Sequence, residues 1–229
     1  MSSAAPSPTA RRRRWWASWV LVTALAIAIT AISVPPYLTG GANFPLDRTI
    51  VGYYTSLVLH SVPAGLTLLI GPLQFVPRLR ARFPRAHRIS GRVYLLSVVA
   101  ASATSAYATV VTPSGFPLQV VFTMLIAAWL YTAFEAYRTI RRGDVRMHRV
   151  WTVRNYTLTF AAVTLRVYQL TGMALLPWVD YRDMYTTSAW AGLLGNVLIA
   201  EYFIVHRMLA PKTRESAPAP APRQTAAIG

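Results

Sequence analysis

The chain alternates between long apolar runs and short polar connections. The apolar runs cover residues 15–38, 50–76, 89–111, 117–139, 150–176 and 188–208. A helix needs about 20 mostly apolar residues to cross the hydrocarbon core of a bilayer, and each run has that length. We therefore predict an all-α, multi-pass membrane protein whose six transmembrane helices occupy residues 15–209.

The two ends of the chain differ from this pattern. Residues 1–14 are basic, and residues 210–229 are rich in proline and alanine. Neither segment has enough apolar side chains to form a packed core, so both are predicted to be disordered tails. The first apolar run is longer than a typical export signal and is predicted to be a retained helix.

Charge is distributed unevenly between the connections. The chain has a net charge of +16, although only 13% of its residues are charged. Most arginines precede the first run or follow the second and fourth runs: Arg11, Arg12, Arg13, Arg14, Arg78, Arg80, Arg82, Arg85, Arg88, Arg141, Arg142, Arg146 and Arg149. Cytoplasmic loops are the ones enriched in arginine and lysine. We therefore expect both termini in the cytoplasm, location in the inner membrane, and contact between these arginines and anionic lipid headgroups.

Several other functions are disfavoured by the sequence. The arginines are divided among loops instead of forming one basic face, so nucleic acid is not an expected partner. The chain has no cysteine, which excludes disulfides and thiolate metal ligands. A glycine-rich phosphate loop, a zinc-protease motif and a pair of catalytic carboxylates are also missing from the sequence. Whether the protein is an enzyme is therefore left open.

Polar residues form stripes on two of the predicted helices. Along the fifth run the spacing of three and four residues joins His148, Thr152, Asn155, Thr159, Ala162, Arg166 and Gln169. The second run has a similar stripe, made of Tyr53, Ser56, His60, Pro63, Thr67, Gln74 and Arg78. Lipid would penalise both faces, so they are predicted to point into the bundle, towards each other or a shared cavity.

The stripes place the polar residues at two depths. Eighteen residues separate His148 from Arg166, which corresponds to about 27 Å along a helix. His60 and Arg166 should therefore lie together near the outer face, with Gln74, His87 and His148 near the cytoplasmic face. Glu135 and Glu201 lie near the cytoplasmic ends of their helices, where we expect arginines to neutralise them.

The outer cluster predicts a binding site for a small molecule. A buried cation beside an imidazole suits an anionic or carbonyl-bearing group such as a quinone headgroup. The candidate residues are His60 and Arg166, with Asn155 and Thr159 from the same stripe. Alternatively, His60 hydrogen-bonds Ser56 or Thr159 and only holds helices together.

The motifs of the central region resemble a known family. They comprise Gly71-Pro72-Leu73-Gln74-Phe75 with Pro77-Arg78, then His87-Arg88 with Gly91-Arg92 and Tyr94, then Arg142-Gly143-Asp144 and His148-Arg149. This combination resembles the bacterial predicted membrane proteins called domain of unknown function 2306 (DUF2306). The resemblance runs from about residue 60 to residue 166, within a core of about residues 50–176. It implies a multi-helix inner-membrane protein and no agreed activity.

A second resemblance is to b-type cytochromes, in which histidines from different helices clamp a haem near one membrane face. It implies that His87 and His148 are axial ligands of one b-type haem, with Arg92 and Arg154 on the propionates and Gln74 nearby. The open alternative is that both histidines pack or contact lipid phosphates at the membrane boundary.

Three functions follow from these patterns. The first is a membrane redox component, an oxidoreductase component if the protein is an enzyme, that binds one haem b or a quinone. The second is a transporter or permeation helper that uses the polar stripes as a path for a small solute. The third is a scaffold or assembly factor without a ligand, which is consistent with the missing catalytic motifs.

Overall fold

The structure, a computed structural model, describes residues 7–40 and 49–210, apart from the side chains of Pro8 and Arg11. Within those ranges every regular element is helical. In chain order they are α1 (Pro8–Thr39), α2 (Tyr53–Ile70), the 3₁₀ helix η1 (Gly71–Phe75), α3 (Pro77–Arg82), α4 (Pro84–Val111), α5 (Phe116–Arg141), α6 (Val145–Leu175), α7 (Tyr181–Phe203) and the π-helical turn η2 (Ile204–Leu209). Residues 1–6, 41–48 and 211–229, which include most of the predicted tails, lie outside the described ranges.

Six of these helical segments are long and apolar enough to cross a membrane. They are α1, α2 continued by η1, α4, α5, α6, and α7 continued by η2. The prediction of an all-α protein with six transmembrane helices is therefore confirmed. The cytoplasmic location of both termini stays a prediction.

Helices α1, α4, α6 and α7 begin five to seven residues before their apolar runs, and the difference is largest for α1 and α7. Helix α1 starts at Pro8, where the Ser7 hydroxyl accepts a hydrogen bond from the Ala10 amide. Helix α7 starts at Tyr181 instead of residue 188, because the Asp180 carboxylate accepts from the Arg182 amide. Capping residues set these starts, and the apolar run begins only inside the helix. Residues 8–14 are consequently helical and not part of a tail.

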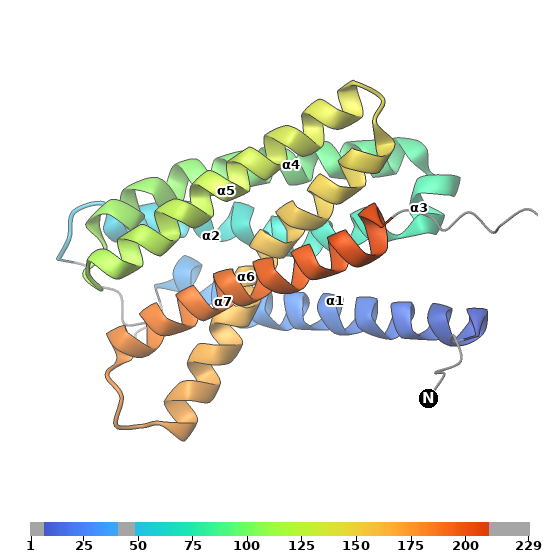
Figure 1. The fold of residues 1–229 in the computed structure, drawn as a ribbon. Helices are drawn as coiled ribbons and strands as arrows, with labels where there is room; N and C mark the ends of the chain where they lie inside the picture. Colours follow the sequence, from blue (N-terminus) through green and yellow to red (C-terminus); the bar gives the residue numbers. More distant parts are fainter. Residues whose placement is uncertain (1–6, 41–48, 211–229) are drawn as a thin grey trace, which may run out of the picture.

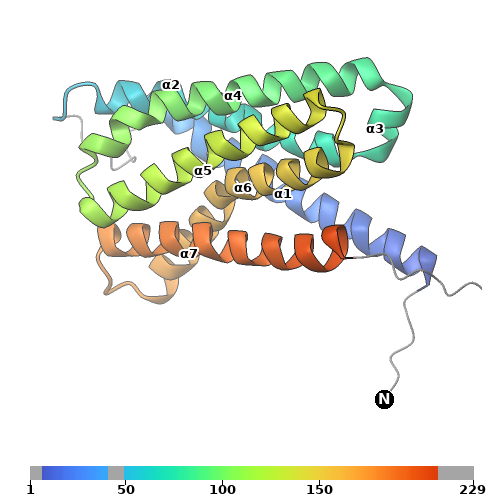
Figure 2. The ribbon, with the colours of Figure 1, turned by 45° about the horizontal axis from the view of Figure 1, so that its top comes forward.

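The spanning helices pack in neighbouring pairs. Helix α2 has its most extensive contacts with α4, whereas α6 packs on both α5 and α7 (Figure 1). Seen after a turn of the molecule, α4 and α5 run beside each other and α7 flanks α6 on the far side from α2 (Figure 2). Helix α6 therefore lies at the centre of the bundle.

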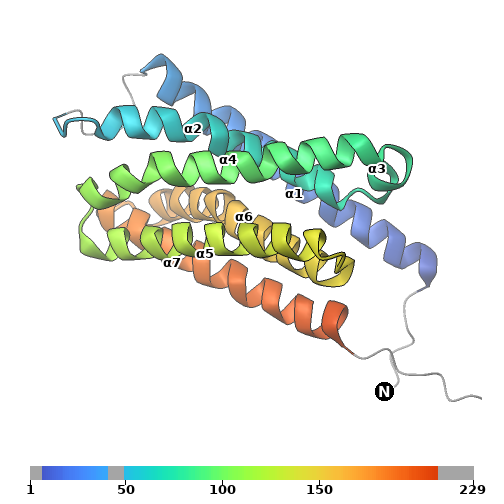
Figure 3. The ribbon, with the colours of Figure 1, turned by 90° about the horizontal axis from the view of Figure 1, so that it is seen from above.

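Helix α1 is the least enclosed of the six. Its most apolar 18-residue window is 11% buried, against 28% to 39% for the other spans. The N-terminal half of α1 diverges from the bundle (Figure 3). The rest is held against α2, where Gly65 approaches Val34 and Thr30 so closely that a Cβ atom would lie 3.1–3.2 Å from their methyl groups. Trp19 adds a hydrogen bond to the carbonyl of Pro72.

The two ends of the bundle are distinguished by their connections. We call the end that carries α3 and the α5–α6 connection (residues 142–144) the α3 end. The opposite end carries the α4–α5 connection (residues 112–115) and the α6–α7 connection (residues 176–180). According to the predicted topology, the α3 end faces the cytoplasm.

Candidate functional site

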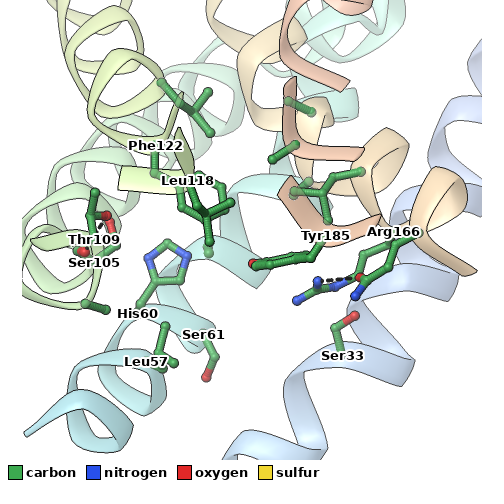
Figure 4. A pocket seen from close by; sticks show the side chains of 18 of the residues that line it. Ser33, Leu57, His60, Ser61, Ser105, Thr109, Leu118, Phe122, Arg166 and Tyr185 are labelled. Atoms are coloured by element: carbon green, nitrogen blue, oxygen red, sulfur yellow. Dashed lines mark hydrogen bonds between the residues drawn. The ribbon is translucent and has the colours of Figure 1, made fainter. Parts of the chain in front are cut away.

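A cavity of about 520 Å³ lies in the half of the bundle opposite the α3 end. All six spanning helices contribute to its walls, among them Ser33 of α1, His60 of α2, Thr109 of α4, Phe122 of α5, Arg166 of α6 and Tyr185 of α7 (Figure 4). Most of the lining surface is apolar, although serine, threonine and tyrosine side chains also contribute to it. Such a cavity has the size and character of a small-molecule site.

Among the residues that the structure describes, Arg166 is the only charged side chain that lines this cavity. It lies nine residues before the end of α6 at Leu175, which is about 14 Å along the helix. The guanidinium donates to the side-chain oxygen of Gln169 at 3.1 Å and lies 5.7 Å from the ring centre of Tyr185. Tyr37 of α1 and Tyr181 of α7 complete this polar surrounding.

Arg166 has no carboxylate partner within residues 7–40 and 49–210. The two ion pairs of that part of the chain join Glu135 to Arg138 and Arg154 to Glu201, both outside the cavity. A guanidinium stays protonated in proteins, so among the described residues the positive charge of Arg166 is balanced by phenol and amide dipoles and by no carboxylate. A charge in such a place is costly in a membrane unless it has a use.

Two further polar groups of the cavity have unused hydrogen-bonding capacity. The Thr30 hydroxyl of α1 is buried and has no hydrogen-bond partner. On α2, Nδ1 of His60 lies 2.8 Å from the carbonyl oxygen of Ala101 on α4. The imidazole therefore links α2 to α4 through one nitrogen, and its other edge faces the cavity (Figure 4). The predicted contacts of His60 with Ser56 or Thr159 are replaced by this bond to the backbone.

A smaller cavity of about 80 Å³ continues the first one towards the α3 end. His60, Ala64, Leu68, Leu125, Trp129 and Ala162 line both cavities. The smaller cavity is almost entirely apolar, because its polar neighbours use their hydrogen bonds elsewhere. Together the two cavities form a space with one polar region, around Arg166, and one apolar extension.

Asn155 and Thr159, predicted to join the outer site, take part in a buried network between α4, α5 and α6, and Thr159 also lines the smaller cavity. The Tyr94 hydroxyl lies 2.7 Å from the Asn155 oxygen and 2.8 Å from the Thr159 hydroxyl. The Asn155 amide donates to Thr132 and to the carbonyl of Trp129, whose indole donates to Thr159. Each of these groups has a protein partner, so the network's evident role is to hold three helices together.

His87 and His148 lie in the α3 half of the bundle. The Nδ1 atom of His148 is 2.8 Å from the carbonyl oxygen of Ala136, which links α6 to α5. Within the described part of the chain, Nδ1 of His87 is buried without a hydrogen-bond partner. Neither of the two cavities is lined by these histidines. Their role as haem ligands stays a prediction.

The other residues assigned to the haem have different surroundings. Arg154 forms a two-point ion pair with Glu201 at 2.6 and 2.8 Å and lies over the ring of Trp151. Gln74 donates to Ser90, while Arg92 is exposed.

The second glutamate also has an arginine partner: the Glu135 carboxylate accepts from Arg138 at 2.7 Å. Arginines therefore neutralise both glutamates, as predicted, although the partners come from helices and not from loops.

The sequence patterns missed the contributions of α1 and α7. Tyr181, Tyr185, Ala189 and Leu193 all line the cavity, at a spacing of four residues on one face of α7. Gly192 lets that helix approach α6, since a Cβ atom there would lie 3.1 Å from the backbone nitrogen of Leu165. The spacing of Tyr181 and Tyr185 could have indicated this face of α7 from the sequence. Tyrosines near helix ends are, however, also typical of membrane interfaces.

The described residues contain no group of three or more histidine and acidic side chains that could hold a metal ion. Their defining features are six membrane-spanning helices and one largely apolar cavity with a single charged wall residue. These features define a multi-pass helical membrane protein with an internal pocket.

The family described as "Predicted membrane protein (DUF2306)" matches residues 57–204, and the chain belongs to this family. The match extends beyond the motifs that suggested it and includes the whole of α7. No curated protein and no solved structure matches the chain. The family description names no activity, so function has to be argued from the cavity.

Proposed function

We propose that this protein binds a small amphipathic molecule inside the membrane, with the molecule's anionic or carbonyl oxygen held by Arg166. The observation that carries the proposal is the guanidinium in the cavity wall, which no carboxylate of the described chain neutralises. An oxygen-rich headgroup would accept hydrogen bonds from Arg166 and from the neighbouring phenols. The unpaired Thr30 hydroxyl offers a further contact.

The rest of the cavity suits the apolar part of such a molecule. Leu118, Phe122 and Leu125 of α5 face the polar residues from the opposite wall, and the smaller cavity extends the apolar space beyond His60. Burying an alkyl chain or ring there is favourable at about 25 cal/mol per Å² of apolar surface. Both a quinone with a short tail and a fatty acid satisfy this description.

Binding is favoured over passage across the bundle. The cavities end at the Tyr94, Asn155 and Thr159 network, whose hydrogen bonds are all made within the protein. A solute that moved on towards the α3 end would have to break those bonds.

Three finer hypotheses belong to this proposal: a redox role, a haem b between His87 and His148, and location in the inner membrane. A reduced-minus-oxidised visible spectrum of the purified protein tests the haem.

Titration of the protein in lipid nanodiscs tests the proposal. The probes are decylbenzoquinone for the carbonyl headgroup and dodecanoic acid for the anionic one. Arg166→Leu should weaken binding of at least one probe by about tenfold or more, which corresponds to losing a charged hydrogen bond. Arg182→Leu is the matched control, because Arg182 is an exposed arginine near the same end of the bundle. Equal affinities of wild type and Arg166→Leu for both probes would overturn the proposal.

A further inference from the structure

The donor and acceptor roles of the two ring nitrogens of His60 are set by its surroundings. Its Nδ1 atom faces a carbonyl oxygen, that of Ala101, at 2.8 Å. A carbonyl can only accept, so Nδ1 must carry the hydrogen. In the neutral ring the other nitrogen, Nε2, is then an acceptor, because the partner of one nitrogen sets the state of the other. The backbone of α4 thus fixes which kind of group His60 presents to the cavity.

The cavity consequently offers complementary groups to a ligand. Around Arg166 the protein supplies donors, whereas Nε2 of His60 supplies an acceptor. Threonine and serine hydroxyls of the lining can adapt to either role, but many of them already donate to carbonyls of their own helix, as Ser61 and Thr109 do. His60 is therefore the group that distinguishes a ligand with a hydroxyl from one without.

We infer that the preferred ligand carries a hydroxyl group that donates to Nε2 of His60, in addition to the oxygen held by Arg166. This inference rests on the proposed function and specifies its ligand class as a hydroxylated aromatic amphiphile of the quinol type. Tyr185, Phe122 and Trp129 line the same cavity and can pack against an aromatic ring. His60 is thus a specificity-determining residue, and no chemical step is assigned to it.

The quinol and quinone forms of one compound provide matched probes, because they share a shape and differ by two hydrogens. Decylhydroquinone, kept reduced under argon, and decylbenzoquinone are titrated into nanodiscs that contain the full chain. Wild type should bind the quinol about tenfold more tightly, as expected for one additional hydrogen bond in a dry site. In His60→Asn the ratio should fall to about one, in keeping with loss of that bond.

Two variants separate specificity from packing. His60→Asn retains an amide N–H at the position of Nδ1, so the bond to Ala101 can persist while the cavity-facing acceptor is lost. His60→Gln instead places an amide oxygen near the position of Nε2 and should restore part of the preference. Thermal unfolding of both variants shows whether the bundle is intact.

The outcomes separate the inference from the proposed function. Equal binding of quinol and quinone by wild type, or a quinol preference that persists in His60→Asn, would overturn the role of His60. Failure of wild type to bind either form would overturn the quinol-type ligand. Dodecanoic acid still reports on the proposed function in that case, because its binding depends on Arg166 and needs no hydroxyl donor.

Discussion

The two halves of the bundle treat buried polar groups in different ways. In the α3 half and at mid-bundle, most buried polar side chains of the described residues have protein partners, as in the Arg154–Glu201 ion pair and the Asn155 network, and Nδ1 of His87 is an exception. In the other half, Arg166 and the cavity-facing edge of His60 point into a space of about 520 Å³. Matched groups hold helices together, whereas groups that face a cavity are available to a ligand.

Asn155→Leu should have the largest effect on stability. The substitution preserves side-chain size but removes one hydrogen-bond partner each from Tyr94, Thr132 and the Trp129 carbonyl. We expect the free energy of unfolding in detergent to fall by about 2 kcal/mol, because buried polar groups lose their hydrogen bonds. Asn196→Leu, which removes one bond of 3.3 Å to the Thr157 carbonyl, should cost about 0.5 kcal/mol. Equal losses would mean that the network has no special role.

Removing the charge of Arg154 and removing that of Arg166, both on α6, should change the stability of the protein in different ways. Arg154→Leu breaks the ion pair with Glu201, whose side chain is 38% exposed, so the expected loss of stability is about 1 kcal/mol. Arg166→Leu should leave the stability of the ligand-free protein unchanged or raise it, because an unneutralised charge is replaced by an apolar group. Thermal unfolding of both variants without added ligand gives the comparison. A larger loss for Arg166→Leu would show that this arginine is structural.

Tyr185→Phe should have the smallest effect and should act on binding alone. The substitution keeps the ring beside Arg166 and removes only the phenol hydroxyl. Affinity for the probe that responds to Arg166 should fall about fivefold, and unfolding should be unaffected. Tyr168→Phe is the control, since Tyr168 is an exposed residue of the same bundle end and lines neither cavity. A similar change in both variants would exclude a role for the Tyr185 hydroxyl.

The sequence predicted the helices and the stripe of α6 because both are local patterns. Length and hydropathy identify a spanning helix, and spacings of three and four residues identify its polar face. His60 and Arg166 were expected at one level, and both line the same cavity. Local patterns also identified Asn155 and Thr159 as inward-facing, and both are buried.

The partners of these residues could not be predicted from periodicity. A stripe shows which face of a helix is polar but not which helix lies opposite. For this reason Asn155 was assigned to the ligand site, whereas Tyr94 and Trp129 approach it from α4 and α5. The tyrosines of α1 and α7 were missed in the same way, because their proximity to Arg166 depends on how the outer helices pack.

Native mass spectrometry of the protein released from its own membranes tests the central claim most directly. The wild-type protein should carry a small-molecule adduct that is absent from Arg166→Leu and retained in Arg154→Leu. The reason is that Arg166 lines the cavity and Arg154 does not. The account would be contradicted if wild type carried no adduct, or if Arg166→Leu retained the same adduct.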